Sequence, residues 1–217
     1  MRIDFDAMTY VVEKIETSSA KYPYAIKKTD IPIQYPYFWT IGNLDILDRN
    51  LLGFFCSIKC PGDIILKTYD LARSFRDAGV TVISGFHSPI EKDFLEILLR
   101  GSQPIVICPA RRIISMRIPS IWKKAVDEGR LLLLSPFDEK HKRVTVSLAE
   151  QRNHFVTQLG KEHFIPYAVP ESKTESLCRV VIDSGKKVFT FQSKGQNCLT
   201  EAGAIAVEPA EYIMISK

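Results

Sequence analysis

A serine-glycine turn between two apolar segments is the first place in this chain where residue types and spacing indicate chemistry. In GVTVISGFHSPIEKDFLEILL, Val80–Ile83 favours a buried strand, and Pro89 is suited to open a helix with apolar residues at helical spacing. Between them, Ser84 and Gly85 stop the strand, and a glycine there lets backbone N–H groups approach an anion near a helix N-terminus. The turn has the geometry of a phosphate cradle, although most strand-to-helix turns contain a glycine and bind nothing.

Two further predicted strand-to-helix turns carry polar and basic residues. SIKCPGD follows the predicted strand 51–56, and PESKTESL follows the predicted strand 164–169. The second turn has the S-x-x-E spacing of a capping box, so it is either a well-capped helix start or a turn that aims free N–H groups at a phosphate. The candidate binding residues of these two turns are Ser57, Lys59, Gly62, Ser172, Lys173 and Thr174.

A basic segment follows the predicted strand 104–108. Residues 110–126 contain five Lys and Arg and no Asp or Glu, and the basic character continues in residues 140–143. Either a solvated basic surface or a polyanion-binding surface explains such a cluster, since phosphate contacts need grouped cations. Because the segment begins at the end of a strand, Arg111 and Arg112 are candidate phosphate contacts.

One arginine lies within the apolar face of a predicted helix, 145–159. Arg152 falls near the middle of the arc that contains Leu148 and Phe155. A buried guanidinium needs a carboxylate, carbonyl groups or a bound anion to offset its desolvation, so Arg152 has either an internal partner or a ligand. Its neighbour Asn153 either donates a hydrogen bond at the same place or lies beside the apolar face.

These residues are positioned by alternating strands and helices. The predicted strands are 51–56, 80–83, 104–108, 130–134, 164–169 and 187–191, and the predicted helices are 64–78, one from Pro89, 145–159 and 173–183. We expect Asp63 to cap the first of these helices and Gly79 to end it. The alternation predicts an α/β fold with a mostly parallel sheet and helices on both faces. Ligands of such sheets bind outside the carboxyl ends of the strands, where the strand order reverses.

Residues 1–44 are predicted to be an arm that precedes a domain over 45–217. Apolar residues at helical spacing, from Met8 to Ile15, predict an amphipathic helix within residues 1–20. The following KYPYAIKKTDIPIQYPYFW contains three prolines, Pro32 among them, and is predicted to be extended. Its aromatic side chains either stack on nucleobases or fix the arm to the domain.

The composition is that of an ordinary globular protein. Hydrophobic residues make up 46% and charged residues 25% of the chain, and the net charge of +4 permits an acidic partner without requiring one. No apolar run has the length of a membrane helix, and the N-terminus lacks a signal peptide, so we expect a cytoplasmic protein without membrane contact. The five cysteines and four histidines lack zinc-site spacing, and we expect free thiols, no metal and no cofactor.

Together the three turns resemble the DNA-processing protein A family (DprA, also called Smf), part of a wider Rossmann-like group that includes the LOG nucleotide hydrolases. The resemblance spans residues 45–192. VISGFHSPIE is similar to the family's S-G-x-A-x-G-I-D turn, and QRNHFV is similar to its R-N-R-x-I segment. FFCSIKCPGD resembles the G-S-R-x-x-S-x-Y-G loop in Gly62 and in having a basic residue, Lys59. PESKTESL stands where the family carries a Ser-Gly-Ser-x-x-Thr loop.

This chain departs from the family pattern at four positions. His87 stands where the family has Ala, Pro89 where it has Gly, His154 where it has the second Arg of R-N-R, and Glu91 where it has Asp. His87 is nevertheless a candidate contact of the first cradle, because it lies in the same turn. It is also a candidate neighbour of Cys56 across adjacent turns, which would make a reactive thiol, although packing explains Cys56 equally well.

Three functions follow. The resemblance implies a non-catalytic, dimeric protein that binds single-stranded DNA and helps to load a recombinase, with Lys59, Arg111, Arg112 and Arg152 neutralising phosphates. A nucleotide-binding sensor, in which the three turns enclose one phosphorylated small molecule, is the alternative. A LOG-like phosphoribohydrolase ranks lowest, because the P-G-G-x-G-T-x-x-E motif is absent and Lys173-Thr174-Glu175 keeps only a remnant of it.

Overall fold

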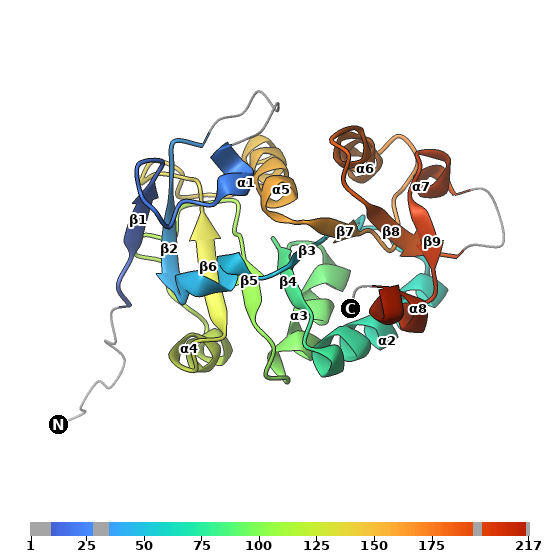
Figure 1. Ribbon diagram of the computed structural model, residues 1–217, viewed down its shortest axis with the longest axis horizontal. Helices are drawn as coiled ribbons and strands as arrows, with labels where there is room; N and C mark the ends of the chain where they lie inside the picture. Colours follow the sequence, from blue (N-terminus) through green and yellow to red (C-terminus); the bar gives the residue numbers. More distant parts are fainter. Residues whose placement is uncertain (1–9, 28–34, 193–196, 216–217) are drawn as a thin grey trace.

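The computed structural model describes residues 10–27, 35–192 and 197–215. These residues form a nine-stranded sheet between two layers of helices (Figure 1). The strands are β1 (Glu13–Glu16), β2 (Tyr37–Gly42), β3 (Leu51–Phe54), β4 (Thr81–Ser84), β5 (Ile105–Ile107), β6 (Leu131–Ser135), β7 (Glu162–Phe164), β8 (Val188–Phe191) and β9 (Ile205–Val207). Their order across the sheet is β1-β2-β6-β5-β4-β3-β7-β8-β9. Only the β1–β2 and β2–β6 pairs are antiparallel, so the predicted mostly parallel, Rossmann-like α/β fold is confirmed.

Helices cover both faces of the sheet. One face packs against α1 (Tyr24–Lys27), the 3-10 helix η1 (Leu44–Asp48), α5 (Val146–Leu159), α6 (Lys173–Asp183) and α7 (Cys198–Glu201). The other face packs against α2 (Gly62–Ala78), α3 (Pro89–Leu99), α4 (Ser120–Asp127) and α8 (Pro209–Ile215). Successive strand residues alternate between the two cores, as Val82 and Ile83 of β4 do. The sheet is therefore buried on both sides, which explains its nearly continuous apolar strands.

The predicted N-terminal helix is wrong for residues 13–16, which form the edge strand β1. Only Ile15 of this strand is buried, and Val11, which belonged to the predicted apolar face, is 75% exposed. Pairing with β2 supplies the hydrogen bonds that an isolated helix would make internally. Met8 lies outside the described residues.

Three buried aromatic residues of the arm fix it to the domain. Tyr22, Tyr35 and Phe38 are buried, and the Tyr35 ring packs on Phe155 of α5 with a centroid distance of 4.7 Å. The Tyr35 hydroxyl also donates to the Gln151 carbonyl oxygen at 2.7 Å. The division of the chain at residue 44 stays a prediction, while β2 pairs directly with β6 in the common sheet. The predicted helix-breaking Pro32 lies outside the described residues.

Several element ends differ from expectation, among them the predicted strand 51–56, which ends at Phe54. Gly79 ends α2 in the left-handed conformation with φ +76°, as predicted, but the N-cap of α2 is Pro61 and Asp63 lies in the first turn. β7 ends at Phe164, so most of the predicted strand 164–169 is a loop. The cause of this early end is Pro166, which has no N–H to continue the ladder.

Candidate functional site

A cavity opens where the strand order reverses. β4, β5 and β6 lie on one side of β3, whereas β7, β8 and β9 lie on the other. At the carboxyl ends of these strands, a cavity of about 320 Å³ is lined by the loops after β3, β4 and β7 and by α5 and the start of α6. Open α/β sheets bind their ligands at this position.

The cavity gathers residues that lie far apart in the sequence. Eight of the thirteen predicted site residues line it: Ser57, Lys59, His87, Arg152, Asn153, Ser172, Lys173 and Thr174. Sequence reasoning missed its apolar lining, which includes Phe55, Ala149, Val169 and Leu177. In the sequence these four residues have the pattern of ordinary core residues, so nothing in the sequence indicated that they line a cavity.

The other five predicted residues do not line the cavity. Gly62 is the exposed first residue of α2. Ser84 is fully buried, and its hydroxyl oxygen accepts a hydrogen bond from Phe86 N at 3.2 Å, while Gly85 lies beneath the Arg152 side chain. Arg111 and Arg112 lie in the loop after β5.

A buried carboxylate occupies the predicted phosphate cradle. Glu91 Oε1 accepts a hydrogen bond from Cys56 N at 3.0 Å, and Glu91 Oε2 accepts from His87 N at 2.7 Å and Ser88 N at 3.3 Å. Ser88 and Glu91 form a full capping box at the start of α3. Glu91 thus joins the first two turns and takes the N–H groups that an external anion would need. The S-x-x-E spacing of Ser88 and Glu91 is the sequence signal for this contact.

Arg152 has internal partners and also faces the cavity. Its guanidinium donates from Nη1 to the Cys108 carbonyl oxygen at 3.0 Å and from Nε to Asn153 Oδ1 at 2.8 Å, and the residue is 4% exposed. No carboxylate pairs with it among residues 10–27, 35–192 and 197–215. A Cβ atom added to Gly85 would lie 0.9 Å from Arg152 Nη1, so the glycine makes room for the guanidinium. Arg152 therefore carries a buried positive charge to the cavity wall without an anionic partner.

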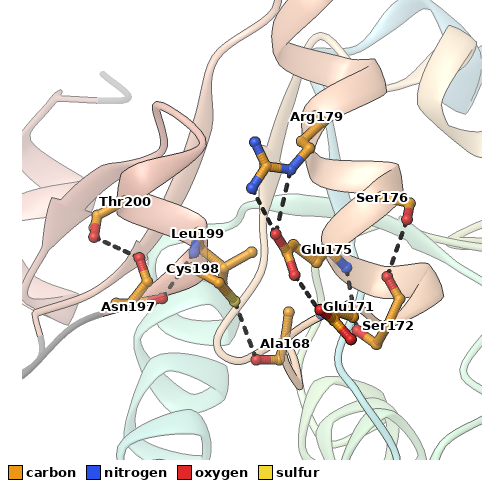
Figure 2. A network of polar contacts seen from close by, with 10 residues as sticks. All are labelled: Ala168, Glu171, Ser172, Glu175, Ser176, Arg179, Asn197, Cys198, Leu199 and Thr200. Atoms are coloured by element: carbon orange, nitrogen blue, oxygen red, sulfur yellow. Dashed lines mark hydrogen bonds and ion pairs between the residues drawn. The ribbon is translucent and has the colours of Figure 1, made fainter.

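The start of α6 borders the cavity, and Figure 2 shows the polar contacts of Ser172 and Glu175 at this helix start. Ser172 Oγ accepts from Glu175 N at 3.3 Å, whereas the Glu175 carboxylate accepts from Glu171 N at 2.6 Å instead of closing a capping box. Arg179 donates to Glu175 at 2.6 Å and holds the pKa of that carboxyl below its ordinary value. In the part of the chain that the structure describes, the N–H groups of Lys173 and Thr174 have no acceptor.

The basic side chains around the cavity differ in their partners. Within the described residues Lys59 makes no ion pair, while Lys173 pairs with Glu150. Arg112 donates to the Glu139 carbonyl oxygen at 3.2 Å, which ties the loop after β5 to the loop after β6, and Arg111 is exposed. The β5 loop adjoins the cavity through Cys108, the carbonyl partner of Arg152. The cavity therefore has a cationic border with one unpaired lysine.

A reactive Cys56 activated by His87 is not favoured. Both residues line the cavity, but a hydrogen bond to Cys60 and burial raise the pKa of the Cys56 thiol. Among the described residues, no three or more His, Cys, Asp and Glu side chains are grouped so as to hold a metal ion. None of the helices described here has the length and apolar character needed to span a bilayer.

A larger hollow of about 660 Å³ lies at the opposite edge of the sheet. Its lining comes from the amino ends of β3, β4 and β7 and from α8. It contains none of the predicted site residues, and ligands of open α/β sheets bind at the other edge. The smaller cavity is therefore the candidate site.

The reversal of strand order and the cavity outside the strand ends define a Rossmann-like α/β protein. The family model for DNA recombination-mediator protein A matches residues 13–216. The chain belongs to this family.

Solved structures show the same fold. DNA processing protein A from Streptococcus pneumoniae is 15% identical with a TM-score of 0.75, over 97% of this chain and 75% of that chain. A structure of DNA processing protein A from Helicobacter pylori, described for its single-stranded DNA binding mode, is 16% identical with a TM-score of 0.76. The match covers 95% of this chain and 96% of that chain. A molybdenum cofactor carrier protein from Chlamydomonas reinhardtii is 11% identical with a TM-score of 0.54, and the match covers 77% of this chain and 96% of that chain. A search of curated proteins found no match.

Proposed function

We propose that this chain binds single-stranded DNA through the cavity and the neighbouring basic loops, and that it has no chemistry of its own. The observation that carries the proposal is the gathering of Lys59, Arg152 and the start of α6 at the reversal of strand order. Family membership and the likeness to the Helicobacter pylori protein, described for its single-stranded DNA binding mode, support it.

The contacts suggest how a phosphate chain would lie. Glu91 fills the first cradle, so the phosphates are recognised by Lys59 on one side of the cavity and by the N–H groups of Lys173 and Thr174 on the other. Arg111 extends the cationic border along the sheet edge. Such contacts position a backbone without reading its sequence.

The test is binding of a fluorescently labelled oligothymidine, measured by anisotropy at low salt. We expect Lys59→Ala to weaken binding by about tenfold, as for the loss of one charged phosphate contact. Lys187→Ala is the matched control, because Lys187 is also an exposed lysine but precedes β8 at the opposite edge of the sheet. Equal affinities of the two variants would refute the assignment of this cavity.

A nucleotide sensor is the second candidate, and the cavity volume of about 320 Å³ favours it. This volume is at the lower end of the range of small-molecule sites. The sensor predicts that a mononucleotide raises the melting temperature and competes with the oligonucleotide. Competition by a mononucleotide, together with no difference between short and long oligonucleotides, would favour the sensor.

Hydrolysis of a phosphoribosyl bond ranks below both. The carboxylate of Glu175, in the remnant of the LOG motif, is held by Arg179 and Glu171 N (Figure 2). A carboxylate held in this way does not face a sugar in the cavity. The proposal also includes a homodimer and a recombinase partner, which light scattering and co-sedimentation with a recombinase filament would test.

A further inference from the structure

Two aromatic residues of the arm keep part of their surface open to solvent. Tyr37 and Trp39 of β2 are half-buried, unlike the three buried aromatic residues that fix the arm to the domain. Their rings meet edge to face, with a centroid distance of 6.4 Å. Residues two apart on a strand share a face, so both rings lie on one side of the sheet. We call these two rings the β2 aromatic pair.

The β2 aromatic pair lies at the same edge of the sheet as the candidate site. β2 runs antiparallel to β6, and Trp39 pairs with Ser135, the last residue of β6. The first residues of β2 are therefore at the carboxyl ends of the parallel strands. From β4, beside the cavity, to β2 the sheet passes through β5 and β6. Three strand spacings amount to about 14 Å.

The loop after β5 connects the cavity to the β2 aromatic pair. Arg152, on the cavity wall, donates to the Cys108 carbonyl oxygen at 3.0 Å, at the start of this loop. Later in the loop, the Arg111 carbonyl oxygen accepts a hydrogen bond from Ser135 Oγ at 2.8 Å, and Ser135 is the strand neighbour of Trp39. The exposed Arg111 thus belongs to a loop that touches the cavity wall at one point and the neighbour of Trp39 at another.

One cation and one carboxylate lie directly against the rings. Lys14 Nζ lies 4.4 Å from the ring centroid of Tyr37 and 5.9 Å from that of Trp39. Lys14 also pairs with Glu16 at 2.6 Å. Because this ion pair is close to neutral, the groups suited to a polyanion that carries flat bases are the two rings and the charge of Arg111.

We propose that the β2 aromatic pair is a stacking platform for the bases of single-stranded DNA whose backbone leaves the cavity along the loop after β5. The inference rests on the proposed function and lengthens the path of the strand by about four nucleotides, at about 3.4 Å per phosphate. Every base has a π-face, so stacking on these rings is tolerant of sequence. The bases of a duplex are already stacked on each other, and the platform therefore favours single strands.

Tryptophan fluorescence tests the platform, because the chain contains two tryptophans. In Trp122→Phe the remaining emission comes from Trp39, and we expect it to fall on titration with a long oligothymidine, since a stacked base quenches an indole. Trp39→Phe is the matched variant. Its remaining Trp122 lies in α4, which Figure 1 shows near the amino end of β6, so its emission should stay unchanged. Oligothymidine binding without any loss of Trp39 emission would overturn the proposal.

Binding affinity, measured by anisotropy, is the second test. Tyr37→Ala should weaken oligothymidine binding by about fivefold or more, as for the loss of one stacked base, without changing its salt dependence. Tyr37→Phe keeps the ring and should bind as the unsubstituted chain does. Tyr69→Ala is the control, because Tyr69 is also half-buried but lies on α2, bonded to Asp93 at 2.7 Å. Equal affinities of Tyr37→Ala and Tyr69→Ala would count against the platform.

The platform and the proposed function fail in different ways. Weaker binding by Lys59→Ala, with no change in Tyr37→Ala, would keep the cavity as the site and remove the platform. Loss of Trp39 emission with full affinity in Lys59→Ala would keep the platform and remove the cavity. A chain that binds no oligothymidine in either measurement would refute both.

Discussion

Substitution of Gly85 by Ala tests how Arg152 is held at the cavity. The added Cβ would lie 0.9 Å from Nη1 and 1.8 Å from Cζ of Arg152, whereas an ordinary contact begins at 3.4 Å. The guanidinium must therefore move by about 2.5 Å, which breaks its 3.0 Å bond to the Cys108 carbonyl oxygen. A hydrogen bond from a charged donor contributes about 1.5–3 kcal/mol, so we expect the free energy of unfolding to fall by about 2–4 kcal/mol.

A double-mutant cycle isolates this contact. In an Arg152→Ala background the guanidinium is gone, so Gly85→Ala should lower the free energy of unfolding by less than about 0.5 kcal/mol, which gives a coupling of about 1.5–4 kcal/mol. Urea denaturation measures all four proteins. Gly62→Ala is the control, because a Cβ there meets nothing within 4 Å. If Gly85→Ala costs the same with and without Arg152, the glycine is required by the backbone and the reasoning fails.

Three further predictions concern polar groups that are buried or half-buried. Glu91→Gln places an amide donor against N–H donors and should lower the free energy of unfolding by about 2–4 kcal/mol in urea, with the exposed Glu96→Gln as control. Burial lowers the pKa of His163 to about 3 from 6.5, so its stability contribution is complete above pH 6.5 and is lost on acidification. His163 should therefore make the free energy of unfolding about 2.5 kcal/mol lower at pH 4 than at pH 6, and His163→Leu should reduce that difference. Lys186→Met removes an ammonium that donates to three carbonyl oxygens at 2.6–2.8 Å near the end of α5. Lys186→Met should lower the free energy of unfolding, measured by urea denaturation, by about 1–3 kcal/mol, whereas Lys187→Met should leave it unchanged.

Each of these has a contradicting result. Equal stability of Glu91→Gln and Glu96→Gln would show that the two turns do not depend on the carboxylate. An acid dependence that stays unchanged in His163→Leu would assign it to other groups. If Lys186→Met and Lys187→Met have the same free energy of unfolding, the end of α5 does not depend on the Lys186 ammonium.

The sheet was predictable because its strands are apolar on both faces and are separated by helices with clear periodicity. β4 and α3 show this best, since Val80–Ile83 and Pro89 marked both elements. The edge strand β1 was not predictable in this way, because Ile15 is its only buried residue and one apolar position gives no alternating pattern. Its conformation depends on pairing with β2, a contact that local sequence does not encode.

The candidate site was predictable in its location more than in its contacts. Parallel strands end at one edge, so the residues after β3, β4 and β7 had to meet there. The partner of Arg152 was left open because a main-chain carbonyl, that of Cys108, leaves no sequence signal. The role of Glu91 depends on Cys56, 35 residues away, so it required the packing of two turns.

The dependence of oligothymidine affinity on salt tests the central proposal most directly. Four phosphate contacts, by Lys59, Arg111, Arg112 and Arg152, predict a log–log slope of about −2.8, since each contact on a single strand contributes about −0.7. Lys59→Ala should bring the slope to about −2.1, and Lys187→Ala should leave it unchanged. A slope near zero, or the same slope for Lys59→Ala and the unsubstituted chain, would contradict binding of DNA at this cavity.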